Sequence, residues 1–437
     1  MSFIADKQTL DDLSLLGKYN THSIFHIFNQ VKTRGGEKLL DQLFLHPLTD
    51  AGQINNRSAA FRYFGDHPAT FPFDEKRLGQ MEAFLDEGCA GNFPAALWQM
   101  TRKKVMALLV KDDTFQLQQQ GLDTSIQVLR ECNRLLQRLE KEGLDKNTPW
   151  EKWVAVARNI FRDERLKALD ARDRSLWQNA QLHYLVAHVF RQPLKELLEL
   201  TYEIEVYITV AAVGREKGFS YATAFPKEKN MLVATGVKHP GLDKAVANPL
   251  SFSGNSNVLF LTGANMAGKS TLMKSTGIMI YLAHMGFPVA AQQLQFSVLD
   301  GIYSSVNVPD DLNRGYSHFY AEVLRVKKVA EEVDAGKHLF VIFDELFKGT
   351  NVKDAYDATL AVTEAFTAFT DCFFIISTHI FEAGDALKSQ GDQIQFEFLP
   401  TIMEGTVPKY TYRLQKGITT DRQGMIIIEN EGILDML

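Results

Sequence analysis

A glycine-rich segment holds the residue types that phosphate chemistry requires. Residues 263–270 read GANMAGKS, which fits the phosphate-binding loop pattern G-x-x-x-x-G-K-[ST]. In such loops backbone amides surround phosphate oxygens, and the N-terminus of the following helix adds partial positive charge. We expect Lys269 to reach the β- and γ-phosphates and the Ser270 hydroxyl to bind Mg²⁺. The residues expected to contact the nucleotide here are Gly263, Ala264, Asn265, Met266, Ala267, Gly268, Lys269, Ser270 and Thr271.

Two carboxylates follow an apolar run farther along the chain. Residues 339–343 read LFVIF, and Asp344 and Glu345 come directly after them. Both acids should therefore stand at the C-terminal edge of a parallel sheet, where α/β proteins bind ligands. Asp344 would hold Mg²⁺ through its coordinated water, and Glu345 is a candidate general base for the water that attacks the γ-phosphate. A strand ending in Asp-Glu is a weak signal alone, and the phosphate loop upstream strengthens it.

Two more polar stretches could complete the site. Residues 373–376 form an apolar strand pattern, and His379 follows it, so that His379 could hydrogen-bond the γ-phosphate or the attacking water. A lone histidine is more often structural, but this position favours the nucleotide interpretation. Residues 315–317 read GYS, and such a turn before a helix offers amides and the Ser317 hydroxyl to an anion. The same serine could instead simply cap the helix.

Short β-type runs separated by helical patterns must position these residues. This alternation is typical of a mainly parallel α/β sheet. The expected strands cover residues 231–235, 258–262, 301–306, 338–343 and 372–377, with additional strands at 393–399, 409–414 and 425–428.

The first half of the chain has helical periodicity instead. A helix is expected from a glycine pair to the proline that closes segment 33–47, and apolar residues recur at three- and four-residue steps in 129–139 and 197–211. Such stripes predict long helices packed as antiparallel pairs or bundles. We therefore expect an α/β plus all-α protein. A helical domain (1–226) would precede a P-loop nucleotide-binding domain (227–437).

Composition narrows the class of protein. The 437 residues include 47 Lys plus Arg against 53 Asp plus Glu, a net charge of −6 that argues against a uniformly basic nucleic-acid binder. The basic cluster 102–104 is expected to be a solvated face. Three widely spaced cysteines fit a reducing compartment, and the sequence has neither a signal peptide nor an apolar run long enough to span a bilayer. These features predict a cytoplasmic protein without membrane contact.

These motifs resemble those of the MutS family of DNA mismatch-repair ATPases. The loop 262–271 is similar to the family's TGPNMGGKST, and 310–319 to its DDL-x-x-G-x-ST-F signature. Segment 344–350 looks like DEIGRGT, with Lys348 where the family has arginine, and 377–379 looks like ATH.

The resemblance extends over nearly the whole chain. Lys238-His239-Pro240 looks like the family's RHP motif, and 247–250 resembles the stretch near the adenine, which implies that Asn248 contacts the nucleotide. Ala245 stands where an aromatic residue often stacks on adenine. Segments 33–50 and 203–225 resemble the start and the end of the family's helical core domain.

The resemblance implies an ATP- and Mg²⁺-dependent hydrolase acting as a homodimer, in which Ser317 faces the nucleotide of the other subunit. ATP turnover would move the helical arms, and duplex or structured DNA would be the partner. The family's mismatch-reading and connector domains would precede the core, yet only about thirty residues stand before Thr33. The resemblance therefore implies a shortened form with two domains only, a helical core/lever domain (1–226) and a P-loop (ABC-type) ATPase domain (227–437), that couples ATP hydrolysis to DNA binding in mismatch repair or related DNA maintenance. Without the mismatch-reading domain, direct reading of mismatches is not predicted.

Three alternatives stay open. The protein could bind branched DNA, or it could be an ATP-driven clamp that contacts a protein partner, such as a repair protein, without touching DNA. The mildly acidic composition slightly favours the second. A small-molecule P-loop kinase shares the loop but would not need the signature segment or the helical half.

Overall fold

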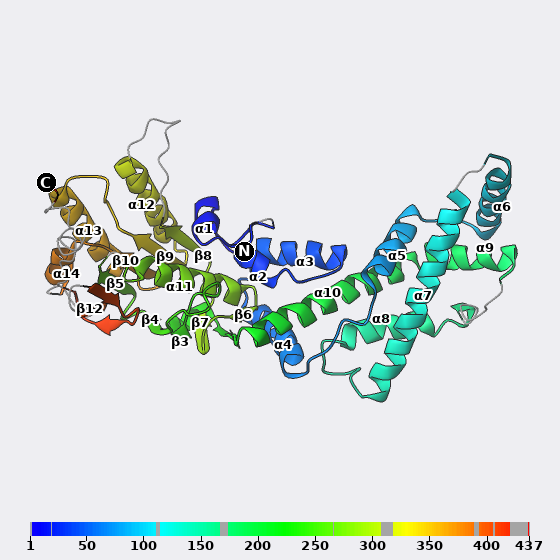
Figure 1. Ribbon diagram of the computed structural model, residues 1–437, viewed down its shortest axis with the longest axis horizontal. Coiled ribbons are helices and arrows are strands. Elements are labelled where there is room, and N and C mark those ends of the chain that lie inside the picture. The colour runs from blue at the N-terminus through cyan, green and yellow to red at the C-terminus, as the bar shows by residue number, and fades with distance from the viewer. Residues whose placement is uncertain are drawn as a thin grey trace. The chain divides into compact units, whose positions relative to one another are not determined.

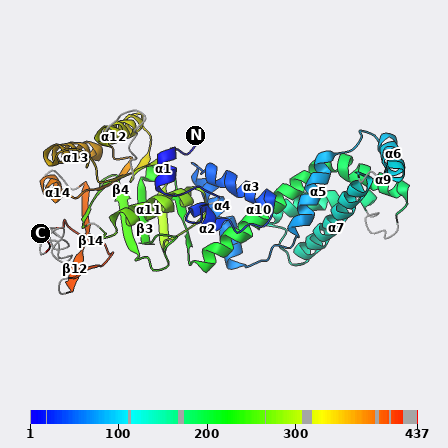
Figure 2. The ribbon, with the colours of Figure 1, turned by 45° about the horizontal axis from the view of Figure 1, so that its top comes forward.

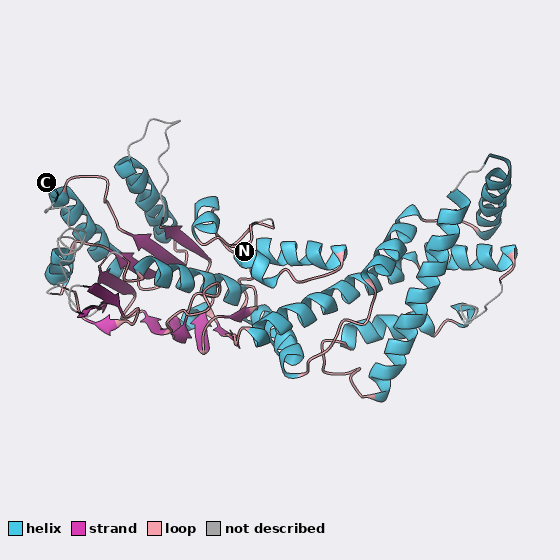
Figure 3. Ribbon diagram, viewed as in Figure 1, coloured by secondary structure: helices cyan, strands magenta, loops and turns pink. Residues whose placement is uncertain are grey.

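The chain divides into two compact units (Figure 1). The computed structural model describes residues 2–18, 20–110, 114–166, 174–264, 266–306, 318–388, 393–404, 407–419 and 436. The sheet unit comprises Met1–Phe28, Leu43–Ala59 and Val213–Leu437, and the helical unit comprises Asn29–Gln42 and Ala60–Ala212. All the described strands belong to the sheet unit (Figure 3).

This division differs from the single boundary near residue 226 that the sequence predicts. The N-terminal residues belong to the sheet unit because they pair with its edge: Ile4 forms a parallel bridge with Gly301. The later change of unit falls inside helix α10 (Arg191–Glu216), between Ala212 and Val213. The assignment of 1–226 and 227–437 as functional domains stays a prediction.

The helical unit forms around long amphipathic helices. Its helices, of which α3, α4 and α10 have residues in the sheet unit as well, are α3 (Arg34–Leu45), α4 (Ala51–Asp66), α5 (Glu75–Glu87), α6 (Phe93–Val110), α7 (Thr114–Lys141), α8 (Glu151–Phe161), α9 (Leu176–Tyr184), the π-helical turn η2 (Leu185–Val189) and α10. The predicted stripes lie in α7 and α10, and Leu129, Leu136, Leu197 and Ile204 are buried in one core cluster. Helical periodicity therefore identified the packing faces correctly.

A buried carboxylate fixes the start of α3. Glu205 of α10 is 1% exposed, and its carboxylate accepts hydrogen bonds from the amides of Lys32 (2.9 Å) and Thr33 (3.1 Å). It also accepts one from the Thr33 hydroxyl. The tight packing explains the glycine after the helix start, because a Cβ at Gly35 would overlap the ring of Tyr202.

A six-stranded, mainly parallel sheet forms the centre of the sheet unit. Its order is β14 (Gln415–Lys416), β11 (Ile394–Leu399), β5 (Val258–Gly263), β10 (Phe373–Ser377), β9 (Leu339–Asp344) and β8 (Gly301–Ser305). All neighbours are parallel except β14, which pairs antiparallel with β11. The strands β5, β10 and β8 are wholly buried, which explains the apolar runs of β5 and β10.

Helices cover both faces of this sheet (Figure 2). Helices α12 (His318–Asp334), α13 (Val352–Thr367) and α14 (Phe381–Leu387) share one core cluster with alternate strand residues. Helix α11 (Lys269–His284) packs on β5, β8 and β9, where Gly277 lies close to the Ile342 side chain of the opposite face. The prediction of a mixed helix and sheet protein with parallel strands is confirmed.

A second sheet was only partly predicted. Its order is β2 (Thr223–Phe225), β7 (Gln293–Ser297), β3 (Met231–Val237) and β4 (Asn248–Ser253). Small elements complete the described unit: α1 (Lys7–Asp12), α2 (Ile24–Phe28), β1 (Ser220–Tyr221), η3 (Lys227–Lys229), β6 (Pro288–Val289), β12 (Thr401–Glu404) and β13 (Val407–Tyr410).

Two strand predictions near the end of the chain have different outcomes. The expected strand 409–414 is wrong beyond Tyr410, because Tyr412 adopts φ +56° and interrupts the extended backbone. The expected strand 425–428 lies outside the described residues. Among the helices that are described, none is both long and apolar enough to cross a bilayer.

Candidate functional site

Two glycines shape the loop between β5 and α11. Gly263 has φ +149° and Gly268 has φ +101°, a region of backbone space that side chains rarely adopt. A Cβ at Gly268 would also lie 2.9 Å from Cδ1 of Tyr412. Both the dihedral angle and the space therefore require glycine at Gly268. The loop ends at Lys269, where α11 begins, so the first amides of that helix face the same region.

The Lys269 side chain folds under this loop. It is 5% exposed, and its Nζ donates hydrogen bonds to the carbonyl oxygens of Gly263 (2.8 Å) and Ala264 (3.2 Å). Burial lowers the pKa of the ammonium group, and the carboxylates of Asp344 and Glu345 partly offset that effect. The structure thus holds a desolvated cation at the base of the loop, bound to carbonyl groups that phosphate oxygens could replace.

Ser270 and Asp344 meet beside the lysine. The Ser270 hydroxyl donates to Oδ2 of Asp344 at 2.5 Å. Strand β9 ends at Asp344, in register with Ser377 of β10, which brings the carboxylate to the edge where β5 gives way to the loop. The other oxygen of Asp344, Oδ1, is buried and has no hydrogen-bond partner among the described residues. A hydroxyl and a carboxylate with an unused buried oxygen form a hard-oxygen donor set of the kind that Mg²⁺ binds.

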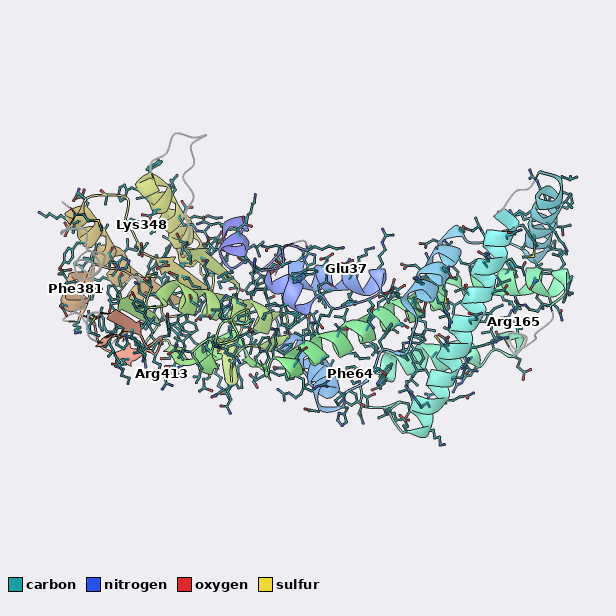
Figure 4. All side chains as sticks on the ribbon, in the orientation of Figure 1. Glu37, Phe64, Arg165, Lys348, Phe381 and Arg413 are labelled. Atoms are coloured by element: carbon teal, nitrogen blue, oxygen red, sulfur yellow. The ribbon has the colours of Figure 1, made fainter. Side chains whose placement is uncertain are left out.

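Glu345 forms a close pair with His379. The distance from Nε2 of His379 to Oε1 of Glu345 is 2.5 Å, and Nζ of Lys348, labelled in Figure 4, lies 3.7 Å from Oε2. The hydrogen bond from His379 is the largest influence lowering the pKa of Glu345, and burial opposes it. Glu345 adopts φ +57°, while its amide donates to the carbonyl of Ser377 (2.9 Å). The carboxylate is therefore held ionised and oriented.

A cavity of about 660 Å³ adjoins these groups. It is lined by Val237, Lys238, His239, Leu242, Asp243, Lys244, Ala245, Val246, Asn248, Ala264, Met266, Gly268, Lys269, Ser270, Thr271, Leu272, Ser275, Glu345, Leu399 and Tyr412. Its volume lies within the range of small-molecule and cofactor sites. Polar loop groups line part of the wall and apolar or aromatic side chains another part, so the cavity can accept a ligand with one charged and one aromatic end.

Asn248 and Tyr412 reach the cavity together, and the sequence analysis missed Tyr412. The Asn248 side chain donates to the Tyr412 carbonyl (2.9 Å) and accepts from the Leu414 amide (2.8 Å). Its amide group therefore holds the segment that carries Tyr412, which lines the cavity with Ala245. Tyr412 was hidden because its position depends on a positive φ and on a contact 164 residues away in the sequence.

The other predicted site residues have varied positions. Thr271 and Met266 line the cavity. Met266 adopts φ +68° and is 77% exposed. Ala267 is buried, and its amide donates a hydrogen bond to the Ala264 carbonyl (3.2 Å). Asn265 and Ser317 lie outside the described residues.

The comparison with family models places this site within a known domain. Residues 259–435 match the model of MutS domain V, an ATPase-type domain, and the match includes the loop, Asp344, Glu345 and His379. It begins in strand β5 and covers most of the six-stranded sheet. Residues 259–435 of this chain therefore form a domain of the MutS family.

Proposed function

We propose that this chain binds ATP with Mg²⁺ in the cavity and hydrolyses the γ-phosphate bond. The observation that carries the proposal is the meeting of Lys269, Ser270 and Asp344 at one sheet edge, with the buried Oδ1 of Asp344 unpaired among the described residues. A buried carboxylate oxygen without a donor is costly unless a ligand compensates it. The donor set therefore fits a hard divalent cation.

Each residue has a distinct role in binding. The Lys269 ammonium would leave its carbonyl partners for the β- and γ-phosphate oxygens, and the loop amides would surround them. Ser270 and Asp344 would hold Mg²⁺, the serine directly and the aspartate through coordinated water. When bound, Mg²⁺ supplies positive charge to phosphate oxygens that become more negative during transfer.

Glu345, positioned by His379, would activate the attacking water. Glu345 is kept ionised by its hydrogen bond with His379 and can accept a proton from a water molecule. His379 is a positioning group for Glu345 in this scheme, and it could also hydrogen-bond the γ-phosphate. Lys348 adds positive charge nearby without the bidentate geometry of an arginine.

The base of the nucleotide would lie at the far end of the cavity. Ala245 offers no ring there, but Tyr412 lines the same cavity and supplies an aromatic face. This arrangement supports a stacked adenine held from the C-terminal part of the domain, with Asn248 fixing the segment that presents the ring.

The family assignment supports a wider function in DNA maintenance. We propose a homodimer in which Ser317 of one subunit faces the nucleotide of the other. ATP binding and hydrolysis would bias the helical unit between two arrangements, with duplex or structured DNA as the partner. The cytoplasm is the proposed location.

A second candidate is an ATP-driven clamp that binds a protein partner without reading mismatches. Exposed apolar side chains on helix α6 of the helical unit favour this second candidate. Apolar side chains contribute little to contacts with a phosphate backbone.

Two substitutions test the ATPase proposal. Lys269→Ala should abolish Mg²⁺-dependent nucleotide binding, whereas Glu345→Gln should keep binding and lower turnover by about a hundredfold or more. The exposed Lys353 provides a matched control, and Lys353→Ala should leave both quantities unchanged. ATP turnover that survives in both site variants would disprove the assignment.

A further inference from the structure

The exposed large apolar side chains of the helical unit are concentrated in one place. Within the described part of that unit, every such residue lies on α6, on α9 or near the start of α7. They are Trp98, Val105 and Leu109 on α6, Leu117 on α7 and Trp177 on α9. Scattered exposed apolar residues need no explanation, but a cluster of this kind is typical of a binding surface.

The α6 members form one narrow stripe. At about 100° per residue, positions 98, 102, 105 and 109 fall within about 60° of one another. Trp98 is 69% exposed and Leu109 is 75% exposed, while Ala96 and Met100 of the same helix are buried. The stripe is thus the side of α6 that faces away from its own core.

Helix α9 packs against the other side of α6, away from the stripe. Figures 1 and 2 both show α6 and α9 side by side. Phe93 at the start of α6 packs edge-on against Trp177 of α9, with ring centroids 5.6 Å apart. Trp177 remains 53% exposed. We call Trp98, Arg102, Val105 and Leu109 the α6 face.

The charges of α6 have a single sign. The helix carries Arg102, Lys103 and Lys104 and has no Asp or Glu between Phe93 and Val110. Arg102 and Lys104 are exposed, and Arg102 lies inside the apolar stripe. None of the three makes an ion pair with a described residue. The expectation of a plain solvated basic face therefore omits the apolar residues around Arg102.

Charge decides which occupant suits the α6 face. Arg102 lies near the middle of the stripe, so a second copy packed about a two-fold axis would bring arginine against arginine. A membrane-bound helix buries a broad apolar face and keeps its charges off it, whereas here an arginine lies within a narrow stripe. A helix with apolar residues at three- and four-residue spacing could bury them against the stripe, and its acidic neighbours could pair with Arg102.

We propose that the α6 face is a docking site for an acidic amphipathic helix of a protein partner. The aromatic side chain of Trp98 would supply most of the affinity, since such residues dominate binding energy at interfaces. Arg102, which lies within the stripe, would supply orientation and salt dependence. This surface is independent of the ATP site.

A synthetic helix tests this proposal directly. The probe is a fluorescent peptide with leucine at the seam positions and glutamate elsewhere, and binding to the full chain is followed by anisotropy. Trp98→Ala with Leu109→Ser should weaken binding by about tenfold or more. Leu45→Ser, at an exposed leucine on another helix, is the matched control and should change nothing. Because all these side chains are exposed, the thermal unfolding midpoint should stay constant.

A charge-reversal variant distinguishes specific docking from non-specific hydrophobic binding. The variant in which Arg102, Lys103 and Lys104 are all changed to Glu should lose its affinity for the glutamate peptide. It should instead bind a lysine/leucine peptide. A peptide with the same composition in scrambled order should not bind. Equal binding of the scrambled peptide would overturn the proposal. So would face variants that instead lose affinity for a short duplex DNA, for anionic lipid vesicles or for their own dimer.

Discussion

Asp6 and Arg325 form a buried ion pair, although 319 residues separate them in the sequence. The guanidinium donates to both carboxylate oxygens, and it also donates to the Ser304 carbonyl (2.6 Å) and to the Thr9 hydroxyl (3.0 Å). Lys328 adds a second cation, with Nζ 2.7 Å from Oδ2 of Asp6. The N-terminal segment is thereby joined to helix α12 and strand β8.

Removing this carboxylate should destabilise the fold. Asp6→Ala leaves Arg325, which is 6% exposed, without its partner, and we expect a loss of about 3 kcal/mol in the free energy of unfolding. Urea denaturation measures the loss. Asp11→Ala, at an exposed aspartate of the same short helix, is the control and should cost less than about 0.5 kcal/mol.

The same pair predicts a pH dependence of stability. Burial alone would raise the pKa of Asp6, but the hydrogen bonds from Arg325 and Lys328 outweigh it, so the pKa lies well below its ordinary value. A depressed folded-state pKa contributes stability that is complete above the unfolded-state value, about 4, and declines as the pH falls below it. Urea midpoints between pH 6 and about pH 2.5 should fall more steeply for the wild type than for Asp6→Asn. Parallel slopes would contradict this prediction.

The pair between Glu345 and His379 predicts a shift in the pH profile of ATP hydrolysis. Since His379 holds the pKa of Glu345 down, His379→Ala should raise it toward the ordinary range and move the acidic limb of the profile to higher pH. Turnover should also fall by about tenfold or more because Glu345 loses its orientation. A lower rate with an unchanged acidic limb would mean that His379 does not act through Glu345.

Tyr412 should affect nucleotide affinity rather than the chemical step. Tyr412→Ala should raise the KM for ATP by about tenfold with kcat nearly unchanged, because stacking stabilises ground state and transition state alike. Tyr412→Phe keeps the ring and should behave as the wild type does. An unchanged KM in Tyr412→Ala would show that the ring does not stack on the base.

Asp344 should control the metal dependence. Asp344→Asn keeps the shape of the side chain but removes its charge, and the Mg²⁺ concentration needed for half-maximal ATP binding should rise by about tenfold or more. Asp354→Asn, at an exposed aspartate in α13, should leave that concentration unchanged. An unaltered Mg²⁺ requirement in Asp344→Asn would show that the metal binds elsewhere.

The sequence predicted the parts of the site that depend on residues adjacent to one another in the chain. Four apolar residues before Gly263 indicated a buried strand, and the spacing from Gly263 to Lys269 and Ser270 located the start of a helix. Apolar residues before Asp344 likewise located the end of a strand. Parallel strands then bring these ends to one edge, which is why residues 74 positions apart form a hydrogen bond.

Long-range partners could not be predicted in this way. Periodicity shows which side of an element is buried but not what buries it, so the bridge of Ile4 to Gly301 gave no local signal. For the same reason the exposed stripe around Trp98 was not predicted. The sequence periodicity of an apolar helix face is the same whether the protein core covers that face or solvent does.

The bridge at Ile4 also bears on how the protein can be cut. A fragment that starts at residue 227, where periodicity suggests a clean division, would leave behind Ile4, Asp6 and Asp12. The backbone of β8 would then lose its outer neighbour, and Arg325 would keep its charge in a buried site without a carboxylate. Such a truncated domain would carry an open strand edge and should aggregate.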